Sequence, residues 1–374
     1  MEFKKINLPF KIKRPVLALG SQTKNSVCFA QGNFAYLSQI HPDLNSLKDF
    51  AKFEKAVKYF LNKNPKIIAY DLHPEYQSTK YALQLNVQRY ALHAIQHHHS
   101  HIASCMVENG LKNQKVIGVA FDGTGLGSDN TFWGAEFFLC NYRDFKRIAH
   151  LKEVPLLGGE RAILEPWRLA AIWLYRLYRD NFLKLDIEFM KKIDKKKWQV
   201  LKNMYLSGFN SPLASSMGRL FDAVASLILV KYKVNFEAEL AMELEETAKR
   251  YRLKVTSYDF SIIQKNKEWI LDPTPVFKEI VKDLKARQDI EKIAYRFHLT
   301  VAWMIKRACL ILRKENRINK VVLSGGVFQN KILLSLSLDL LSKEGFQVFL
   351  PQELPCSDAG IALGQIAIAN FRYH

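Results

Sequence analysis

The sequence lacks the features that mark several large classes of protein. No apolar run approaches the roughly 18 residues that span a bilayer, and the opening stretch MEFKKINLPFKIKRP contains no apolar core of a signal peptide. A cytoplasmic chain without a membrane segment is therefore expected. Tracts rich in Gly, Ser or Pro and short repeats are also missing, which disfavours disorder and repeat architectures.

Cysteine is scarce, and several catalytic signatures are absent. The five cysteines, Cys28, Cys105, Cys140, Cys309 and Cys356, form no C-x-x-C pair. They are typical of reduced thiols and argue against a disulfide scaffold or a thiolate zinc site. The P-loop string, the G-x-S-x-G elbow and the kinase catalytic signature do not occur, so P-loop hydrolysis and serine-hydrolase chemistry have no support.

Positive charge is the one abundant feature of the composition. Fifty-five Lys and Arg stand against 36 Asp and Glu, which gives a formal charge of +19. Such a charge attracts acidic partners, nucleotides or nucleic acid. The lysines are dispersed rather than gathered around aromatic residues, which favours a solvated basic surface over a nucleic-acid interface.

The first part of the chain predicts a small sheet followed by a histidine-rich helix. Gly32-Asn33 is expected to be a hairpin turn between two strands, and the helix is expected over Ala91–Gly110. The strands of this sheet are expected over residues 16–20, 26–31, 35–39 and 66–71.

The remainder predicts a second sheet with a helical insertion. A strand series begins at Val116, and the stretch from Glu165 to about Arg252 has helical periodicity. Further strands are expected over Lys320–Leu323 and Phe346–Leu350. A helix separates these two strands, and another follows Asp358. This order is typical of two α/β lobes that face a cleft.

The run Gln96–His101 predicts a metal site, because it holds four of the ten histidines. On a helix, His97 and His101 lie four residues apart and project about 6 Å apart from one face, so both imidazoles can bind one ion. Asp122 and Asp358, each close to a glycine, are the candidate carboxylate ligands. Imidazole with carboxylate suits iron(II) or zinc. A solvated helix end, or ordinary capping by the aspartates, is the alternative.

Two glycine-rich strings predict a nucleotide site. The D-G-T-G string that begins at Asp122 follows an apolar strand, and its glycines allow close backbone approach to an anion. The string Ser324–Asn330 follows another strand and opens a helix, an arrangement that receives phosphate. Asp222 lies too deep in an apolar helix to be an ordinary cap, so we expect it to bind ribose.

Placed side by side, these strings resemble the C-terminal transferase region of the hydrogenase-maturation carbamoyltransferases, the HypF family. They run in the family's order from about residue 15 onward. The matching strings are DLHPEYQST from Asp71, QHHHSH from Gln96, DGTG from Asp122, EPWR from Glu165, SSMGRLFDA from Ser215, SGGVFQN from Ser324 and DAGIALGQ from Asp358. Ala238 departs from the pattern, since the family often has glycine there.

The resemblance implies an α/β, two-lobed, actin-like (sugar-kinase-like, ASKHA) fold with duplicated RNase H-like lobes. Residues 1–160 would form the first lobe and residues 161–374 the second, with a nucleotide cleft between them. A divalent ion, iron or zinc, would be bound by His97, His101, Asp122 and Asp358. An adenine nucleotide (carbamoyl adenylate, AMP or ATP) would contact Asp122, Gly123, Thr124, Gly125, Asp222, Glu239, Gly325, Gly326 and Asn330.

The implied activity is transfer of carbamoyl from carbamoyl adenylate to the C-terminal cysteine of the maturation protein HypE. The family's adenylate-forming domain has no counterpart in these 374 residues, so a separate adenylate-forming protein is expected. The alternatives are a tRNA threonylcarbamoyl transferase, a small-molecule O-carbamoyltransferase and a non-catalytic nucleotide-binding scaffold of a maturation complex. The H-H-H-S-H string argues against tRNA, because the tRNA-modifying group usually has H-M-E-G-H. No catalytic side chain is assigned.

Overall fold

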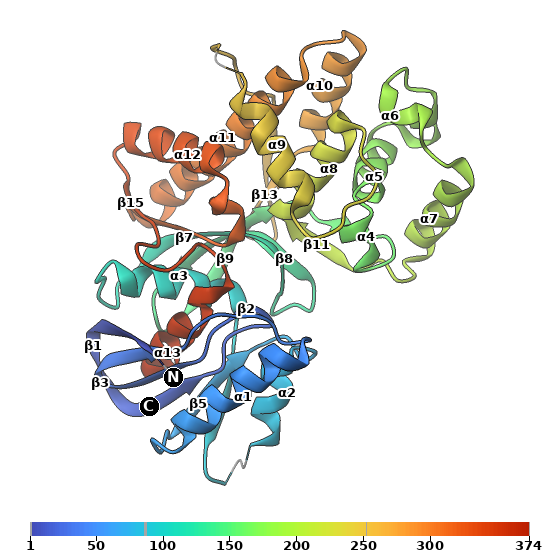
Figure 1. Cartoon of the computed structure of the whole chain (residues 1–374). Helices are drawn as coiled ribbons and strands as arrows, with labels where there is room; N and C mark the ends of the chain where they lie inside the picture. Colours follow the sequence, from blue (N-terminus) through green and yellow to red (C-terminus); the bar gives the residue numbers. More distant parts are fainter. Residues whose placement is uncertain (1, 86–87, 252, 374) are drawn as a thin grey trace.

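The computed structural model describes residues 2–85, 88–251 and 253–373, and it contains two main sheets with helices around them (Figure 1). The first sheet has the strand order β3-β1-β5-β6. The second has the order β12-β13-β9-β8-β7-β14-β15, and β10 and β11 pair at its side. None of the helices in the described ranges combines the length and apolarity needed to cross a bilayer.

The first sheet is built on a long antiparallel pair. β1 (Lys4–Ala18) pairs with β3 (Cys28–Leu37), and the predicted turn at Gly32-Asn33 is wrong, because β3 continues through it. Gly32 has a φ of 61° and lies opposite Ile12, where the register shifts. The glycine therefore makes a bulge within one strand. The parallel strands β5 (Ile67–Asp71) and β6 (Ala91–Ile95) complete the sheet.

The histidine-rich segment forms a strand and then a shorter helix than expected. Residues 91–95 belong to β6, and helix α3 spans His97–Glu108. The helix begins at His97 because the side chain of Gln96 accepts a hydrogen bond from the His99 N–H at 2.8 Å and so caps it. Residues 97–107 are all buried. α3 is therefore a central helix, and its histidines face protein on every side.

The end of the chain returns to the first sheet. After the short helix η3 (Asp358–Gly360), helix α13 (Ile361–Arg372) packs against β1, β3 and α3, and Figure 1 shows it among the N-terminal strands. A Cβ on Gly364 would lie 1.9 Å from the Ser100 carbonyl oxygen, so the two helices touch through backbone. The division at residue 160 stays a prediction; strands from Val116 onward belong to the second sheet.

The second sheet confirms the expected strand series. β7 (Val116–Leu126), β8 (Phe132–Cys140) and β9 (Phe145–Leu151) form an antiparallel meander. β14 (Lys320–Ser324) lies parallel to β7, and β15 (Gln347–Phe349) lies parallel to β14. The sheet is extended by a hairpin that the periodicity did not predict, β12 (Ser261–Lys265) with β13 (Glu268–Asp272).

The predicted helical stretch is interrupted by one strand, and its expected end at Arg252 lies outside the described residues. β11 (Leu213–Ser216) divides it, because its backbone pairs with β8 and β10. The helices of this stretch are α5 (Trp167–Tyr178), η1 (Arg179–Lys184), α6 (Glu188–Lys191), α7 (Lys195–Ser207), α8 (Met217–Leu229) and α9 (Glu239–Lys249). The remaining elements are β2 (Thr23–Asn25), β4 (His41–Asp43), α1 (Leu47–Leu61), α2 (Gln77–Gln84), β10 (Val154–Pro155), α4 (Arg161–Leu164), α10 (Thr274–Lys285), α11 (Ile290–Asn316), η2 (Gly326–Gln329) and α12 (Lys331–Lys343).

Candidate functional site

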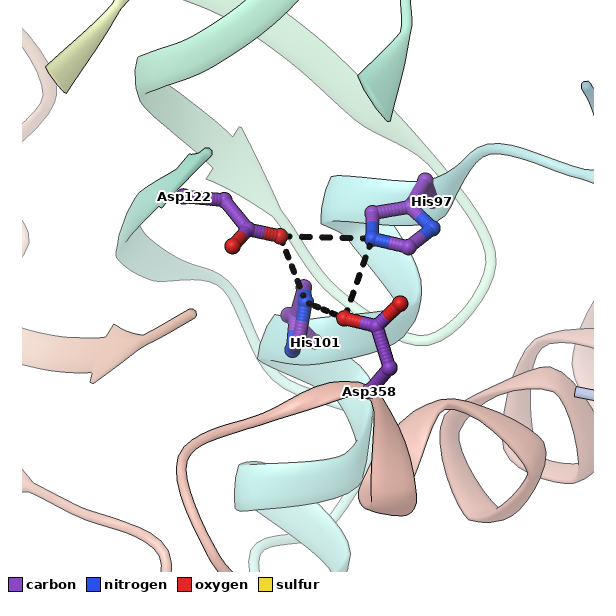
Figure 2. A group of neighbouring side chains, drawn as sticks. All are labelled: His97, His101, Asp122 and Asp358. Atoms are coloured by element: carbon purple, nitrogen blue, oxygen red, sulfur yellow. Dashed lines mark hydrogen bonds and ion pairs between the residues drawn. The ribbon is translucent and has the colours of Figure 1, made fainter. Parts of the chain in front are cut away.

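Four side chains from three distant segments converge on one point (Figure 2). Their candidate ligand atoms all lie within 4.8 Å of one another. The Nε2 atoms of His97 and His101 lie 3.3 and 3.2 Å from Asp122 Oδ2, and both lie 3.6 Å from Asp358 Oδ1. α3 supplies the imidazoles, β7 supplies Asp122 and η3 supplies Asp358. The convergence expected of these four residues is present.

The other two histidines of the run are turned away from this point. His98 Nδ1 lies 3.1 Å from the amide of Gln96, and His99 Nε2 lies 2.7 Å from the carbonyl oxygen of Asn141. Burial lowers the pKa of His98 well below its usual value and lowers that of His99 to about 3. Both rings are therefore neutral structural groups, as the four-residue spacing of the other pair predicts.

A fifth side chain orients His97. Asp71, the last residue of β5, places Oδ2 2.7 Å from His97 Nδ1, and both side chains are fully buried. A hydrogen bond to a carboxylate places the proton of the neutral ring on Nδ1 and leaves the Nε2 lone pair free. Nε2 faces Asp122 and Asp358, so a metal ion that displaced the Nε2 proton would be bound there by this lone pair.

The charges of the site fit a divalent cation. Burial lowers the pKa of His97, but the carboxylates of Asp71, Asp358 and Asp122 outweigh it and hold this pKa well above its usual value. The pKa values of Asp122 and Asp358 are lowered against burial by the two imidazoles. Two carboxylates that stay ionised beside two nitrogen donors match the ligand set of zinc or iron(II).

Asp122 links the ligand cluster to both glycine strings. Its Oδ1 accepts hydrogen bonds from the N–H groups of Gly123 at 2.8 Å and Gly326 at 3.2 Å, while Oδ2 faces the imidazoles. A Cβ on Gly326 would lie 2.9 Å from Oδ1. Gly325 has a φ of 103°, and a Cβ there would lie 2.3 Å from the Phe121 carbonyl oxygen. Only glycine allows this approach of the two strands' ends.

The D-G-T-G string lies in a strand, contrary to the expected turn. Gly123, Thr124 and Gly125 belong to β7, at a register shift against β8, and the chain turns later, after Gly127. The string is in a strand because β7 pairs with β8 on both sides of the shift. Its glycines allow side chains of α3 to approach the strand closely, because a Cβ on Gly125 would lie 2.7 Å from the ring of His98.

The start of α8 lies against the same glycines. Ser216 caps the helix and hydrogen-bonds the carbonyl oxygens of Asp122 and Gly123, and a Cβ on Gly218 would lie 2.9 Å from Gly123 Cα. The predicted ribose ligand Asp222 is one helical turn further on. It is buried, and burial raises its pKa to about 6 even though Arg219 lowers it. The N–H groups at a helix N-terminus bind anions, and the glycines beside this one leave the backbone accessible.

A buried arginine for which no role was predicted lies at this helix start. Arg219 Nη2 is 3.1 Å from Asp222 Oδ2 and 2.9 Å from Glu237 Oε1. Its Nε and Nη1 find no hydrogen-bond partner within the described part of the chain. Glu237 also lies on Gly123, whose Cβ would come 2.3 Å from Oε1. The sequence places Arg219 at the start of an apolar helix, but its contact with Glu237 could not be predicted from spacing along that helix.

Two predicted nucleotide residues are engaged in local contacts. Glu239 begins α9, where its Oε2 accepts a hydrogen bond from the Asn235 N–H at 2.6 Å, so Glu237 rather than Glu239 reaches Gly123. Asn330 caps α12, and its amide nitrogen lies 2.9 Å from His298 Nε2. Both assignments to nucleotide stay predictions.

Comparison with known proteins identifies the family. Residues 11–108 match the HypF Kae1-like domain, and residues 118–365 match the second subdomain of the carbamoyltransferase Kae1-like domain. A carbamoyltransferase HypF of Synechocystis sp. is 36% identical, over 96% of this chain and 48% of the relative. A HypF homolog of Cupriavidus necator is 32% identical, over 95% of this chain and 91% of the relative.

A solved structure agrees with the expected fold. Full-length HypF in a phosphate- and nucleotide-bound form is 38% identical with a TM-score of 0.91, over 98% of this chain and 57% of that one. The likeness confirms the actin-like α/β fold. This chain thus spans about half the length of several relatives and nearly all of one. On these matches and this geometry, the chain belongs to the HypF family of carbamoyltransferases and corresponds to its C-terminal carbamoyltransferase region.

Proposed function

We propose that this chain transfers a carbamoyl group from carbamoyl adenylate to the C-terminal cysteine of a HypE-like maturation protein. The observation that carries the proposal is the convergence of His97, His101, Asp122 and Asp358 beside the backbone of two glycine strings. The family membership supports the reaction class, since the curated relatives are carbamoyltransferases. A cytoplasmic location and a separate adenylate-forming protein belong to this proposal.

The four converging side chains would bind the ion, zinc or iron, and Asp71 would orient His97. When bound, a divalent ion supplies Lewis-acid polarisation of an oxygen of the carbamoyl donor. The chain's own contribution is rigidity. Both imidazoles come from one buried helix capped by Gln96, so their spacing is determined before the ion arrives. Preorganised ligands lose little conformational entropy on binding.

The nucleotide half of the donor would lie along the glycine strings. N–H groups at the start of α8 suit the phosphate. Asp222 suits the ribose hydroxyls, because an ionised carboxylate accepts their hydrogen bonds. Full-length HypF has been solved in a phosphate- and nucleotide-bound form, which supports a nucleotide as a ligand of the family.

Positioning would supply most of the acceleration. The thiolate sulfur attacks the carbamoyl carbon, an S–C bond forms, and the bond from that carbon to the phosphate oxygen breaks and releases AMP. AMP is already a good leaving group, so orientation of the two reactants is the main requirement. The cysteines of this chain are not suited to act as an intermediate carrier, since burial raises the pKa of each of the five thiols, that of Cys356 to about 11.

The test is incubation of the zinc- or iron-loaded chain with carbamoyl adenylate and three acceptors, read by mass. The acceptors are a cysteine-terminated peptide, a polyhydroxylated small molecule and tRNA. We expect a carbamoyl increment on the peptide thiol, and a matched peptide ending in serine should stay unmodified.

The alternatives give different products in the same assay. An increment on the hydroxyl compound alone would favour an O-carbamoyltransferase. Nucleotide binding without any transfer would favour the scaffold. Modification of tRNA, when threonylcarbamoyl adenylate replaces the donor, would favour the tRNA-modifying class. Each of these outcomes would contradict the proposed acceptor.

A further inference from the structure

Arg219 has more hydrogen-bond donors than its partners in the described ranges use. Its side chain is 1% exposed, and its Nη2 lies 3.1 Å from Asp222 Oδ2 and 2.9 Å from Glu237 Oε1. Its Nε and Nη1 are buried, and neither has a hydrogen-bond partner in those ranges. Buried donors without a partner cost free energy, and an anion is the partner that an arginine attracts. The guanidinium therefore retains the capacity to bind a further anion.

The two carboxylates that contact Arg219 differ in how firmly they are held. Asp222 lies on α8 with Arg219, and its side chain is 3% exposed. Glu237 lies in the segment between α8 and α9, and its side chain is 52% exposed. A half-exposed carboxylate can turn into solvent and keep its charge hydrated, whereas a buried one cannot. Glu237 is therefore the exchangeable partner of Arg219, and Asp222 is the permanent one.

The Glu237 carboxylate lies against the backbone of the D-G-T-G string. A Cβ on Gly123 would lie 2.3 Å from Glu237 Oε1 and 3.7 Å from Arg219 Nη2, so Oε1 lies in the space that glycine leaves open. Gly218 of α8 also approaches this residue, since its Cβ would lie 2.9 Å from Gly123 Cα. The Gly123 N–H donates to Asp122 Oδ1 at 2.8 Å. The oxygen of Glu237 therefore lies close to the four converging side chains as well as to Arg219.

The surroundings of this oxygen suit phosphate. The start of α8, a buried guanidinium and the backbone of a glycine meet there. Helix N-termini and arginines both bind phosphate, and a backbone without a Cβ allows its oxygens to approach. A carboxylate oxygen has the charge and the hydrogen-bond acceptors of a phosphate oxygen. Glu237 is thus an anion of the chain's own in a place that suits the anion of a nucleotide.

We propose that Glu237 Oε1 occupies the position of a phosphate oxygen of the carbamoyl donor, and that nucleotide binding replaces this carboxylate with the phosphate on Arg219. The inference rests on the proposed function and adds a competing group to its nucleotide site. The exchange breaks no covalent bond, and the charge of Arg219 stays paired throughout. Because both anions need the same cation, the contact of Arg219 with Glu237 lowers the apparent affinity for the nucleotide.

The test compares AMP binding to Glu237→Gln and Glu243→Gln by calorimetry. Glu243 lies on α9 and pairs with Lys231, so it controls for loss of one carboxylate from this region. We expect AMP affinity to rise about three- to tenfold in Glu237→Gln, the value of one weakened charge-assisted contact. Glu243→Gln should match the unmodified chain. Adenosine, which has no phosphate, should bind all three chains equally.

A second comparison asks whether the gain depends on the arginine. Arg219→Met removes the cation for which the two anions compete. AMP affinity should fall in this variant, and adding Glu237→Gln to it should produce no gain, because interacting residues are not additive. A full gain in the Arg219→Met background overturns the inference. Circular dichroism shows whether Arg219→Met folds, and the comparison of Glu237→Gln with Glu243→Gln decides without it.

The outcomes separate this inference from the function on which it rests. Unchanged AMP affinity in Glu237→Gln overturns the exchange, and reduced affinity does so too, because Glu237 would then be a ligand of the nucleotide. An equal gain for adenosine and AMP also overturns it, since the carboxylate would then cover the nucleoside. If the chain transfers no carbamoyl group, yet Glu237→Gln gains affinity for AMP alone, the proposed function fails and the exchange stands.

Discussion

Asp71 is not among the four converging ligands, yet it decides which nitrogen of His97 is free to bind. We predict that Asp71→Asn weakens zinc binding by roughly 10- to 100-fold, because a neutral amide loses the charge that holds Nδ1–H at 2.7 Å. Competition with a chelator measures the dissociation constant. Asp186→Asn, which changes an exposed carboxylate, is the control. Equal affinities in both variants would contradict an orienting carboxylate.

As the proposed ribose ligand, Asp222 should make nucleotide binding depend on pH. Its pKa of about 6 means that the carboxylate is ionised above pH 6 and becomes a neutral acid below it. Only the ionised form accepts hydrogen bonds from both ribose hydroxyls. We therefore predict that AMP affinity, measured by calorimetry, falls as the pH is lowered from 7 to 5. Asp222→Asn should bind weakly at both pH values, and a falling affinity that persists in this variant would assign the titration elsewhere.

Ala238 carries backbone strain beside the site. Its φ of 69° lies in the left-handed region, which costs a residue with a Cβ about 1–2 kcal/mol. We predict that Ala238→Gly raises the free energy of unfolding by about 0.5 kcal/mol, after the larger entropy of glycine in the unfolded chain is subtracted. Ala308→Gly, within α11, should lower it by about 1 kcal/mol. Denaturant titrations that give both changes the same sign would contradict this.

Among the elements, the sequence predicted those that depend on local pattern. The strands β7, β8, β9 and β14 have apolar runs bounded by turn residues, and the four-residue spacing of His97 and His101 predicted their shared face. The bulge at Gly32 and the strand β6 were missed, because each exists only through pairing with a strand distant in sequence. Strand propensity is read from the local sequence and therefore does not predict pairing with such a partner strand.

The same distinction applies to the site. Asp122 and Asp358 could be predicted, because each is a short acidic residue close to a glycine, where the pattern predicts the end of a strand or the start of a helix. The contacts of Asp71 with His97 and of Arg219 with Glu237 join separate segments of the chain, and no spacing rule reveals them. The D-G-T-G string at Asp122 was recognised, but its strand conformation was not predicted. Glycine serves both in turns and where backbones approach closely, so the string alone does not distinguish the two.

The crossing of α3 and α13 determines where the two imidazoles lie. We predict that Gly364→Ala lowers the free energy of unfolding by about 1–3 kcal/mol, because the new methyl group would meet the Ser100 carbonyl oxygen. Zinc affinity should fall as well, since α3 must shift. Gly208→Ala is the control. Gly208 has a φ of 72°, and a Cβ there would have no atom within 4 Å, so this variant measures the cost of backbone strain alone. Intact zinc affinity in a destabilised Gly364→Ala chain would show that the ligands tolerate the shift.

For the molecule as a whole, the charge of +19 predicts non-specific attraction to nucleic acid and does not predict a specific nucleic-acid partner. Dispersed lysines neutralise phosphates without reading a nucleic acid, and such binding weakens steeply with salt. We predict that tRNA binds weakly at low ionic strength and is released at about 0.2 M salt, without modification. Filter binding across a salt series measures this. Retention of one tRNA at high salt would indicate a specific acceptor.

The return of α13 to the first sheet has a consequence for biosynthesis. The ribosome makes β1, β3 and β5 hundreds of residues before the helix that packs against β1 and β3, and Asp358 emerges just ahead of that helix. Until then the early strands expose an apolar face, which chaperones recognise. Assembly of the cluster formed by His97, His101, Asp122 and Asp358 is correspondingly a late event, because it cannot precede synthesis of Asp358.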